Sequence, residues 1–90
     1  MPYITTEDKA RFATSLAELQ KVVSDTGISN GDLNYLITKL GLMYLKQHGT
    51  SYNIIADVVK AFEMAKFEFY RRVAANYEDG KKQANGDVYS

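Results

Sequence analysis

Three acidic residues in the second half of the chain, Asp57, Glu63 and Glu68, have the chemistry that a magnesium site requires. Carboxylate oxygens are hard ligands that hold Mg²⁺ together with the oxygens of a phosphate substrate. Glu63 and Glu68 lie five residues apart, which separates them by about 140° around a helix. These two residues therefore cannot bind one ion without ligands from another helix.

All-α nucleotide pyrophosphohydrolases of the MazG and dimeric dUTPase type use this chemistry and are also short helical chains that assemble into bundles. Their Glu-x-x-Glu and Glu-x-x-Asp motifs are absent from this sequence. Each glutamate instead has a cation at helical spacing, Lys66 after Glu63 and Arg71 or Arg72 after Glu68, so surface ion pairing explains both. A divergent Mg²⁺-dependent enzyme that combines Asp57, Glu63 and Glu68 across subunits is kept as the alternative hypothesis, and no cofactor or metal is predicted.

The only histidine, His48, directly precedes Gly49. No serine, cysteine or acid lies at a recognisable catalytic spacing from it, and a histidine in the last turn of a helix interacts favourably with the negative end of the helix dipole. The loop at residues 49–51 lacks the glycine-rich approach and the lysine of a phosphate-binding loop. We therefore predict a structural role for His48 and assign no catalytic residue.

The densest basic cluster lies near the C-terminus and is interleaved with two tyrosines that could stack on bases. Acidic residues intervene, and neighbouring arginines point about 100° apart on a helix. The 11 basic and 11 acidic residues of the chain also cancel, unlike the balance of a protein that mainly neutralises phosphates. We interpret the cluster as a solvated, ion-paired helix end, with anion or weak nucleic-acid binding as a second alternative; its members are Arg71, Arg72, Lys81 and Lys82.

The length and composition indicate one small domain without disulfide bonds. A chain of 90 residues buries only about 60% of its unfolded surface, so its own core gives a thin margin of stability. It has no cysteine, which excludes disulfides and thiolate metal sites. Oligomerisation is then the remaining source of additional stability. The N-terminus does not resemble a signal peptide, and no stretch approaches the roughly 20 apolar residues of a membrane span. We therefore expect a cytoplasmic protein without membrane contact.

The pattern of caps and breakers predicts three helices packed as an antiparallel bundle. The first begins at Thr5 or Thr6, and the breakers at residues 25–32 end it. The second runs from about Asp32 to His48 and the third from Ser51 to Gly80. Residues 80–90 are expected to form an extended or partly ordered tail, and the extended termini are candidates for pairing as a short β-ribbon. Residues 1–90 form one helical domain in this interpretation.

The third predicted helix has more apolar surface than one neighbour covers. One stripe follows a near-heptad spacing, and a second runs beside it; their residues are Ile55, Val58, Phe62, Ala65, Phe69 and Val73, and then Val59, Phe67, Tyr70, Ala74 and Tyr77. The second helix adds further apolar residues outside its main stripe. We therefore predict a homodimer or higher homo-oligomer, with an interface that includes Phe62, Phe69, Tyr70, Val73, Tyr77, Leu42 and Leu45.

Several short motifs occur in one order along the chain: LNYLIT at 33–38, EFYRRV at 68–73, YED at 77–79 and NGDVY at 85–89. Together with Met1-Pro2-Tyr3-Ile4, they resemble a family of short uncharacterised proteins of bacteria and phages. The resemblance covers nearly the whole chain and implies that both ends belong to the fold. It implies no activity.

Apolar helix faces without a catalytic set are typical of a protein that works through binding. We therefore expect a non-enzymatic interaction or accessory protein of a cellular or phage-derived system, which acts as a homo-oligomer on an unidentified protein partner.

Overall fold

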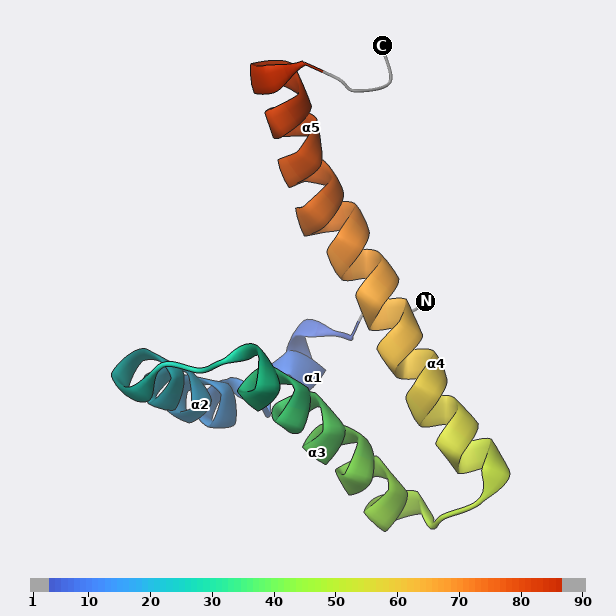
Figure 1. Cartoon of the computed structure of the whole chain (residues 1–90). Coiled ribbons are helices and arrows are strands. Elements are labelled where there is room, and N and C mark those ends of the chain that lie inside the picture. Colours follow the sequence, from blue (N-terminus) through green and yellow to red (C-terminus); the bar gives the residue numbers. More distant parts are fainter. Residues whose placement is uncertain (1–3, 87–90) are drawn as a thin grey trace. The chain divides into compact units, whose positions relative to one another are not determined.

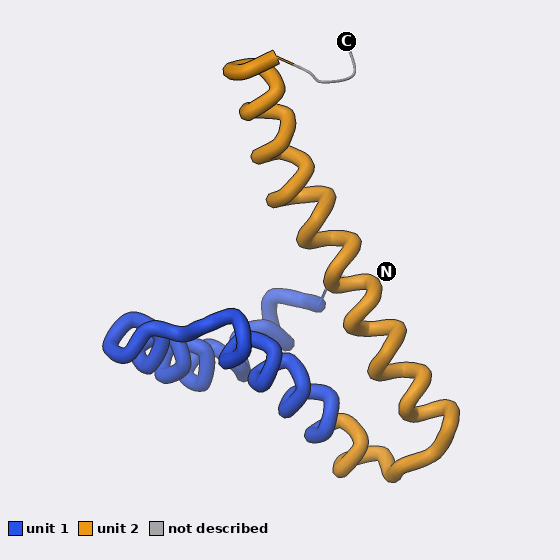
Figure 2. Tube along the Cα trace, in the orientation of Figure 1, with its two compact units in different colours: residues 1–43 blue, residues 44–90 orange. Residues whose placement is uncertain are grey.

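The computed structural model describes residues 4–86, and every regular element in this range is helical (Figure 1). The chain divides into two compact units, residues 1–43 and 44–90, whose boundary falls inside a helix (Figure 2). The all-α prediction is confirmed for the described residues. The bundle arrangement and the single domain stay predictions. The proposed β-ribbon falls largely on residues 1–3 and 87–90, outside the described range.

The first predicted helix is interrupted. Helix α1 (Thr6–Ala10) begins where Thr5 Oγ1 accepts a hydrogen bond of 3.0 Å from the Asp8 backbone N–H, which confirms the expected cap. Helix α2 (Ala13–Thr26) follows after a turn at residues 11–12. In this turn the Phe12 N–H donates to the Lys9 carbonyl, three residues back, at 3.0 Å. The α-helical pattern of hydrogen bonds is interrupted at this turn, so the prediction of one continuous helix is wrong here.

Helix α3 (Asn30–His48) begins two residues earlier than predicted because Ser29 and Asp32 cap it reciprocally. The Asp32 N–H donates to Ser29 Oγ at 3.1 Å, and the Ser29 N–H donates to Asp32 Oδ2 at 2.9 Å. Two backbone donors at the helix start are satisfied in this way. The helix ends as predicted at Gly49, whose φ of 87° lies in the region that favours glycine.

Residues 52–85 form one continuous helical rod, made of α4 (Tyr52–Phe69), a π-helical turn η1 (Tyr70–Ala74) and α5 (Ala75–Asn85) (Figure 1). Ser51 caps its start, as predicted, by accepting from the Ile54 N–H at 3.3 Å. At 1.5 Å per residue the rod is about 50 Å long. We use "the rod" for these residues below.

The predicted helix end at Gly80 is wrong, and residues 80–85 are helical rather than extended. Glycine inside a helix costs only about 1 kcal/mol relative to alanine, and good helix formers follow it in the sequence. The rod ends instead at Gly86, where φ is 86°. A positive φ at glycine, which Gly80 lacks, is what marks the end of this helix.

The described residues contain no buried apolar side chain, and Gly41 is the single buried position among them. Large apolar side chains are exposed on α2, α3 and the rod, from 38% for Leu19 to 85% for Tyr52. Within residues 4–86, no helix combines the length and the apolar character that a membrane crossing requires. The hydrophobic faces of the helices are therefore the main feature that a function must explain.

Candidate protein-binding surface

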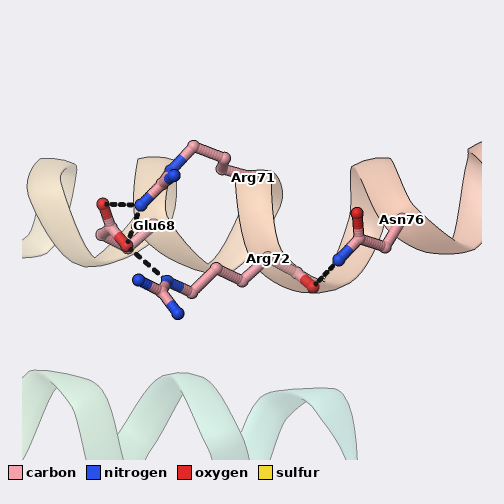
Figure 3. A network of polar contacts seen from close by, with 4 residues as sticks. All are labelled: Glu68, Arg71, Arg72 and Asn76. Atoms are coloured by element: carbon pink, nitrogen blue, oxygen red, sulfur yellow. Dashed lines mark hydrogen bonds and ion pairs between the residues drawn. The ribbon is translucent and has the colours of Figure 1, made fainter.

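The π-helical turn η1 lies near the middle of the rod and is held by backbone and side-chain bonds. The Ala75 N–H donates to the Tyr70 carbonyl, five residues back, instead of the usual four. The Asn76 side-chain amide donates to the Arg72 carbonyl at 2.8 Å (Figure 3). Such turns place one extra residue in a helix and occur frequently at functional sites.

The Glu68 carboxylate accepts hydrogen bonds from both arginines of η1 (Figure 3). Arg71 Nη2 lies 3.0 Å from each carboxylate oxygen, and Arg72 Nε lies 3.0 Å from Oε2. The Glu68 side chain is 29% exposed, whereas those of the arginines are 64% and 61% exposed. The carboxylate therefore lies against the helix, and the two cations cover it from the solvent side.

The two lysines of the predicted basic cluster also have partners on the rod. Lys82 Nζ lies 3.8 Å from Asp79 Oδ1, and Lys81 Nζ lies 5.6 Å from the centre of the Tyr77 ring. The cluster is thus divided between η1 and α5, and each of its cations has a neighbouring group on the same helix. This supports the ion pairing that was predicted, but Arg71 and Arg72 lie near the middle of the rod and not at a helix end; anion binding by Arg71, Arg72, Lys81 and Lys82 stays untested.

Seven apolar residues of the rod form a stripe with heptad spacing on both sides of η1. We call it the heptad stripe, and its members are Ile55, Val58, Phe62, Ala65, Phe69, Val73 and Tyr77. The steps are three or four residues throughout, but two steps of four follow Phe69 in succession. Two such steps would rotate the stripe by about 80° in a regular α-helix. One extra residue in η1 removes about 100°, so Tyr77 stays close to the line of Phe69.

Five of the larger members of the heptad stripe are exposed, whereas Val58 is half-buried. Ile55 is 43% exposed, Phe62 40%, Phe69 67%, Val73 50% and Tyr77 66%. Four of these were predicted for the subunit interface, and the structure places those four along one helix. No ion pair or hydrogen bond joins these side chains to one another. The stripe is therefore an apolar surface about 33 Å long at 1.5 Å per residue, roughly two thirds of the length of the rod.

Three other predicted interface residues lie elsewhere. Tyr70 is 54% exposed and follows Phe69 by one residue, which rotates it by about 100° away. Leu42, 51% exposed, lies on α3 in the first unit, and Leu45 lies one turn later in the second unit and is half-buried. Their part in an interface stays a prediction.

A small polar group joins the last turn of α3 to α4 within the second unit. Tyr44 Oη donates to Asp57 Oδ2 at 3.4 Å, and its ring lies 4.3 Å from the His48 ring, centre to centre. Partial burial raises the pKa of Tyr44 above its ordinary value of 10.0, and the charge of Asp57 and their hydrogen bond raise it further. His48 lies in the last turn of α3, which agrees with the predicted structural role.

The three acids of the enzyme hypothesis do not come together in one chain. Asp57 accepts from Tyr44, Glu63 lies 3.6 Å from Lys66, and Glu68 binds the arginines of η1. No group of three or more potential ligands lies close enough to hold a metal ion in the part of the chain that the structure describes. A metal site built from these acids would thus need ligands from a second chain.

The sequence reasoning missed η1, although the sequence contains its signal. In a regular α-helix the near-heptad spacing ends at Val73, and Tyr77 falls on a second stripe. The two successive steps of four residues after Phe69 mark the place where one residue is inserted.

Comparison with known proteins gives a family but no activity. A family model described as a domain of unknown function (DUF6899) matches residues 1–88. No curated protein and no solved structure matches the chain.

Proposed function

Because the chain belongs to the DUF6899 family of unknown function, we propose a role from its physical properties: it is a non-enzymatic accessory protein that works as a homodimer. The observation behind this proposal is the heptad stripe, which is exposed along the rod while the described residues contain no buried apolar side chain. Apolar residues repeated at heptad spacing are typical of helices that pack against other helices.

Covering the exposed parts of this stripe removes apolar surface from water and so favours association. Burying one valine, leucine, isoleucine or phenylalanine side chain contributes about 1.5–3 kcal/mol. The stripe side chains are about half exposed, so covering them in a dimer adds part of this contribution from each residue of both chains and favours association. A second copy of the chain is the partner that is always present at the same concentration.

The dependence of thermal unfolding on concentration tests the proposal. Dimerisation stabilises the folded chain by mass action, so the midpoint of unfolding is expected to rise over a hundredfold increase in protein concentration. Circular dichroism and calorimetry cover this range. A midpoint that is independent of concentration, together with reversible unfolding of a monomer, would contradict the proposed function.

The enzyme hypothesis needs a separate experiment. A dimer contains two sets of Asp57, Glu63 and Glu68, which could combine across the subunits to bind Mg²⁺. The protein is incubated with Mg²⁺ and a panel of nucleoside triphosphates, and product formation is measured. We expect no turnover and no shift of the unfolding midpoint with ligand. Turnover that is lost in Glu63→Gln would overturn the non-enzymatic assignment.

A further inference from the structure

The heptad spacing of the rod continues beyond η1 once the inserted residue is taken into account. After Phe69, each apolar position lies one residue later than a strict heptad requires, at Val73 and then at Tyr77. The same offset next places Gly80 and Ala84 on the stripe. The insertion in the sequence pattern coincides with the π-helical turn at residues 70–74. The spacing and the backbone geometry thus indicate the same inserted residue.

A hydrogen bond across η1 confirms this change of phase. Tyr70 Oη donates to Glu78 Oε2 at 3.4 Å, although the two residues are eight apart. In a regular α-helix their directions differ by about 80°. With one extra residue in η1 the two residues become one heptad apart and lie on the same side of the rod, beside the heptad stripe rather than on it.

Gly80 supplies a separate observation. Its φ is not positive, and a Cβ atom added to it would have no neighbour within 4 Å. Neither the backbone conformation nor crowding in its own unit therefore requires glycine there, although glycine in a helix costs about 1 kcal/mol relative to alanine. A small residue on a packing stripe allows another helix to approach closely.

We propose that the rod of a second copy covers the heptad stripe through η1 and into α5, so that Tyr77, Gly80 and Ala84 belong to the interface. The length of the stripe favours this occupant, because α2 (Ala13–Thr26) and α3 (Asn30–His48) span only about 21 and 28 Å at 1.5 Å per residue. A second rod matches the stripe over its full length. The inserted residue in η1 keeps α5 in phase for this contact.

This inference rests on the proposed homodimer and adds the extent of its interface, so its experiment separates the two. The dimer dissociation constants of Tyr77→Ala and Tyr70→Ala are measured by sedimentation velocity in the full chain. The two side chains are 66% and 54% exposed; Tyr77 lies on the stripe, whereas Tyr70 lies beside it and also donates to Glu78. We expect Tyr77→Ala to weaken the dimer at least tenfold and Tyr70→Ala to weaken it less than about threefold, as for a surface substitution outside the contact.

Single-residue deletions test whether the inserted residue in η1 aligns the parts of the heptad stripe before and after it. Deleting Ala74 removes the inserted residue from η1, so the stripe stays aligned and the dimer is retained. Deleting Ala61 from α4 rotates the preceding part of the stripe by about 100° relative to the rest, and the dimer is expected to weaken at least tenfold. If the wild-type chain is a dimer but the two tyrosine variants change its dissociation constant equally, and the two deletions also do so, this inference is wrong and the proposed function stands. A monomeric wild type would overturn both.

Discussion

Helices α4 and α5 belong to one continuous rod, yet they present different surfaces to water. Large apolar side chains are exposed along α4, whereas Tyr77 is the only one that α5 exposes within the described residues. On α5 the remaining surface is mostly polar, with an ion pair between Asp79 and Lys82. The difference indicates that α4 needs a covering surface, while α5 tolerates solvent everywhere except along the heptad stripe.

The largest effect is expected from placing a charge on the heptad stripe in α4. Phe69→Asp removes apolar burial twice per dimer, at about 1.5–3 kcal/mol each, and adds two charges to the interface. We expect the dissociation constant to rise by at least about 100-fold. Light scattering at low micromolar concentration measures the change in mass.

Phe67→Asp is the matched control for this variant. Phe67 is 55% exposed and lies two residues before Phe69, about 160° away around the helix. We expect Phe67→Asp to keep the dimer. Equal dissociation by both variants would show that the apolar surface of α4 is not used in the way that we infer.

Removing the cap at the start of the rod is expected to have an effect of intermediate size on the free energy of unfolding. Ser51→Ala removes the side chain that accepts from the Ile54 N–H, and loss of such a cap destabilises a helix by about 1 kcal/mol. Thr50→Ala changes the neighbouring residue and is expected to have little effect. Urea denaturation of both variants measures the free energy of unfolding, and equal losses would contradict the role of Ser51 as the cap of α4.

The ion pairs of the rod are expected to contribute less. Glu68→Gln weakens the contacts with Arg71 and Arg72, and a loss of up to about 1 kcal/mol of unfolding free energy is expected because the arginines are largely exposed. Glu63→Gln, which disturbs only the exposed pair with Lys66 at 3.6 Å, should cost less. Urea denaturation at low and at roughly 1 M salt compares them, because salt screens such pairs. A Glu68→Gln loss that persists unchanged in high salt would count against ion pairing as its cause.

The smallest effect concerns Tyr44. Asp57→Asn removes the negative charge beside the phenol, so the pKa of Tyr44 should fall toward 10.0 but stay above it, since partial burial is the larger cause of the shift. A raised pKa favours the neutral phenol in the folded state. Its stabilising contribution is therefore present below pH 10 and lost as pH rises through the folded pKa. Nuclear magnetic resonance titration of Tyr44 measures the shift, and an unchanged pKa would contradict the Asp57 contact.

The caps of the helices could be predicted from the sequence because each depends on residues close together in the chain. Thr5, Ser51 and Gly49 have the roles that local chemistry gives them. The break at residues 11–12 could not be predicted in this way, since neither glycine nor proline marks it. Gly80 misled the prediction because the helix-forming residues that follow it outweigh a cost of about 1 kcal/mol.

The candidate surface was predicted only in part. Apolar spacing identified Phe62, Phe69, Val73 and Tyr77, but the sequence alone placed Tyr77 on a second stripe. The π-helical turn joins it to the first stripe, and its position depends on backbone bonds such as that from Ala75 to Tyr70. Which molecule covers the stripe depends on a second chain, so local sequence rules do not determine it.

The most direct test of the proposed dimer is the mass of the unmodified chain in solution. Sedimentation equilibrium is measured from low to high micromolar concentration, with circular dichroism on the same samples. We expect a helical particle of twice the chain mass of 10.1 kDa. A helical, stable particle of 10.1 kDa throughout this range would contradict the claim that a second copy covers the heptad stripe.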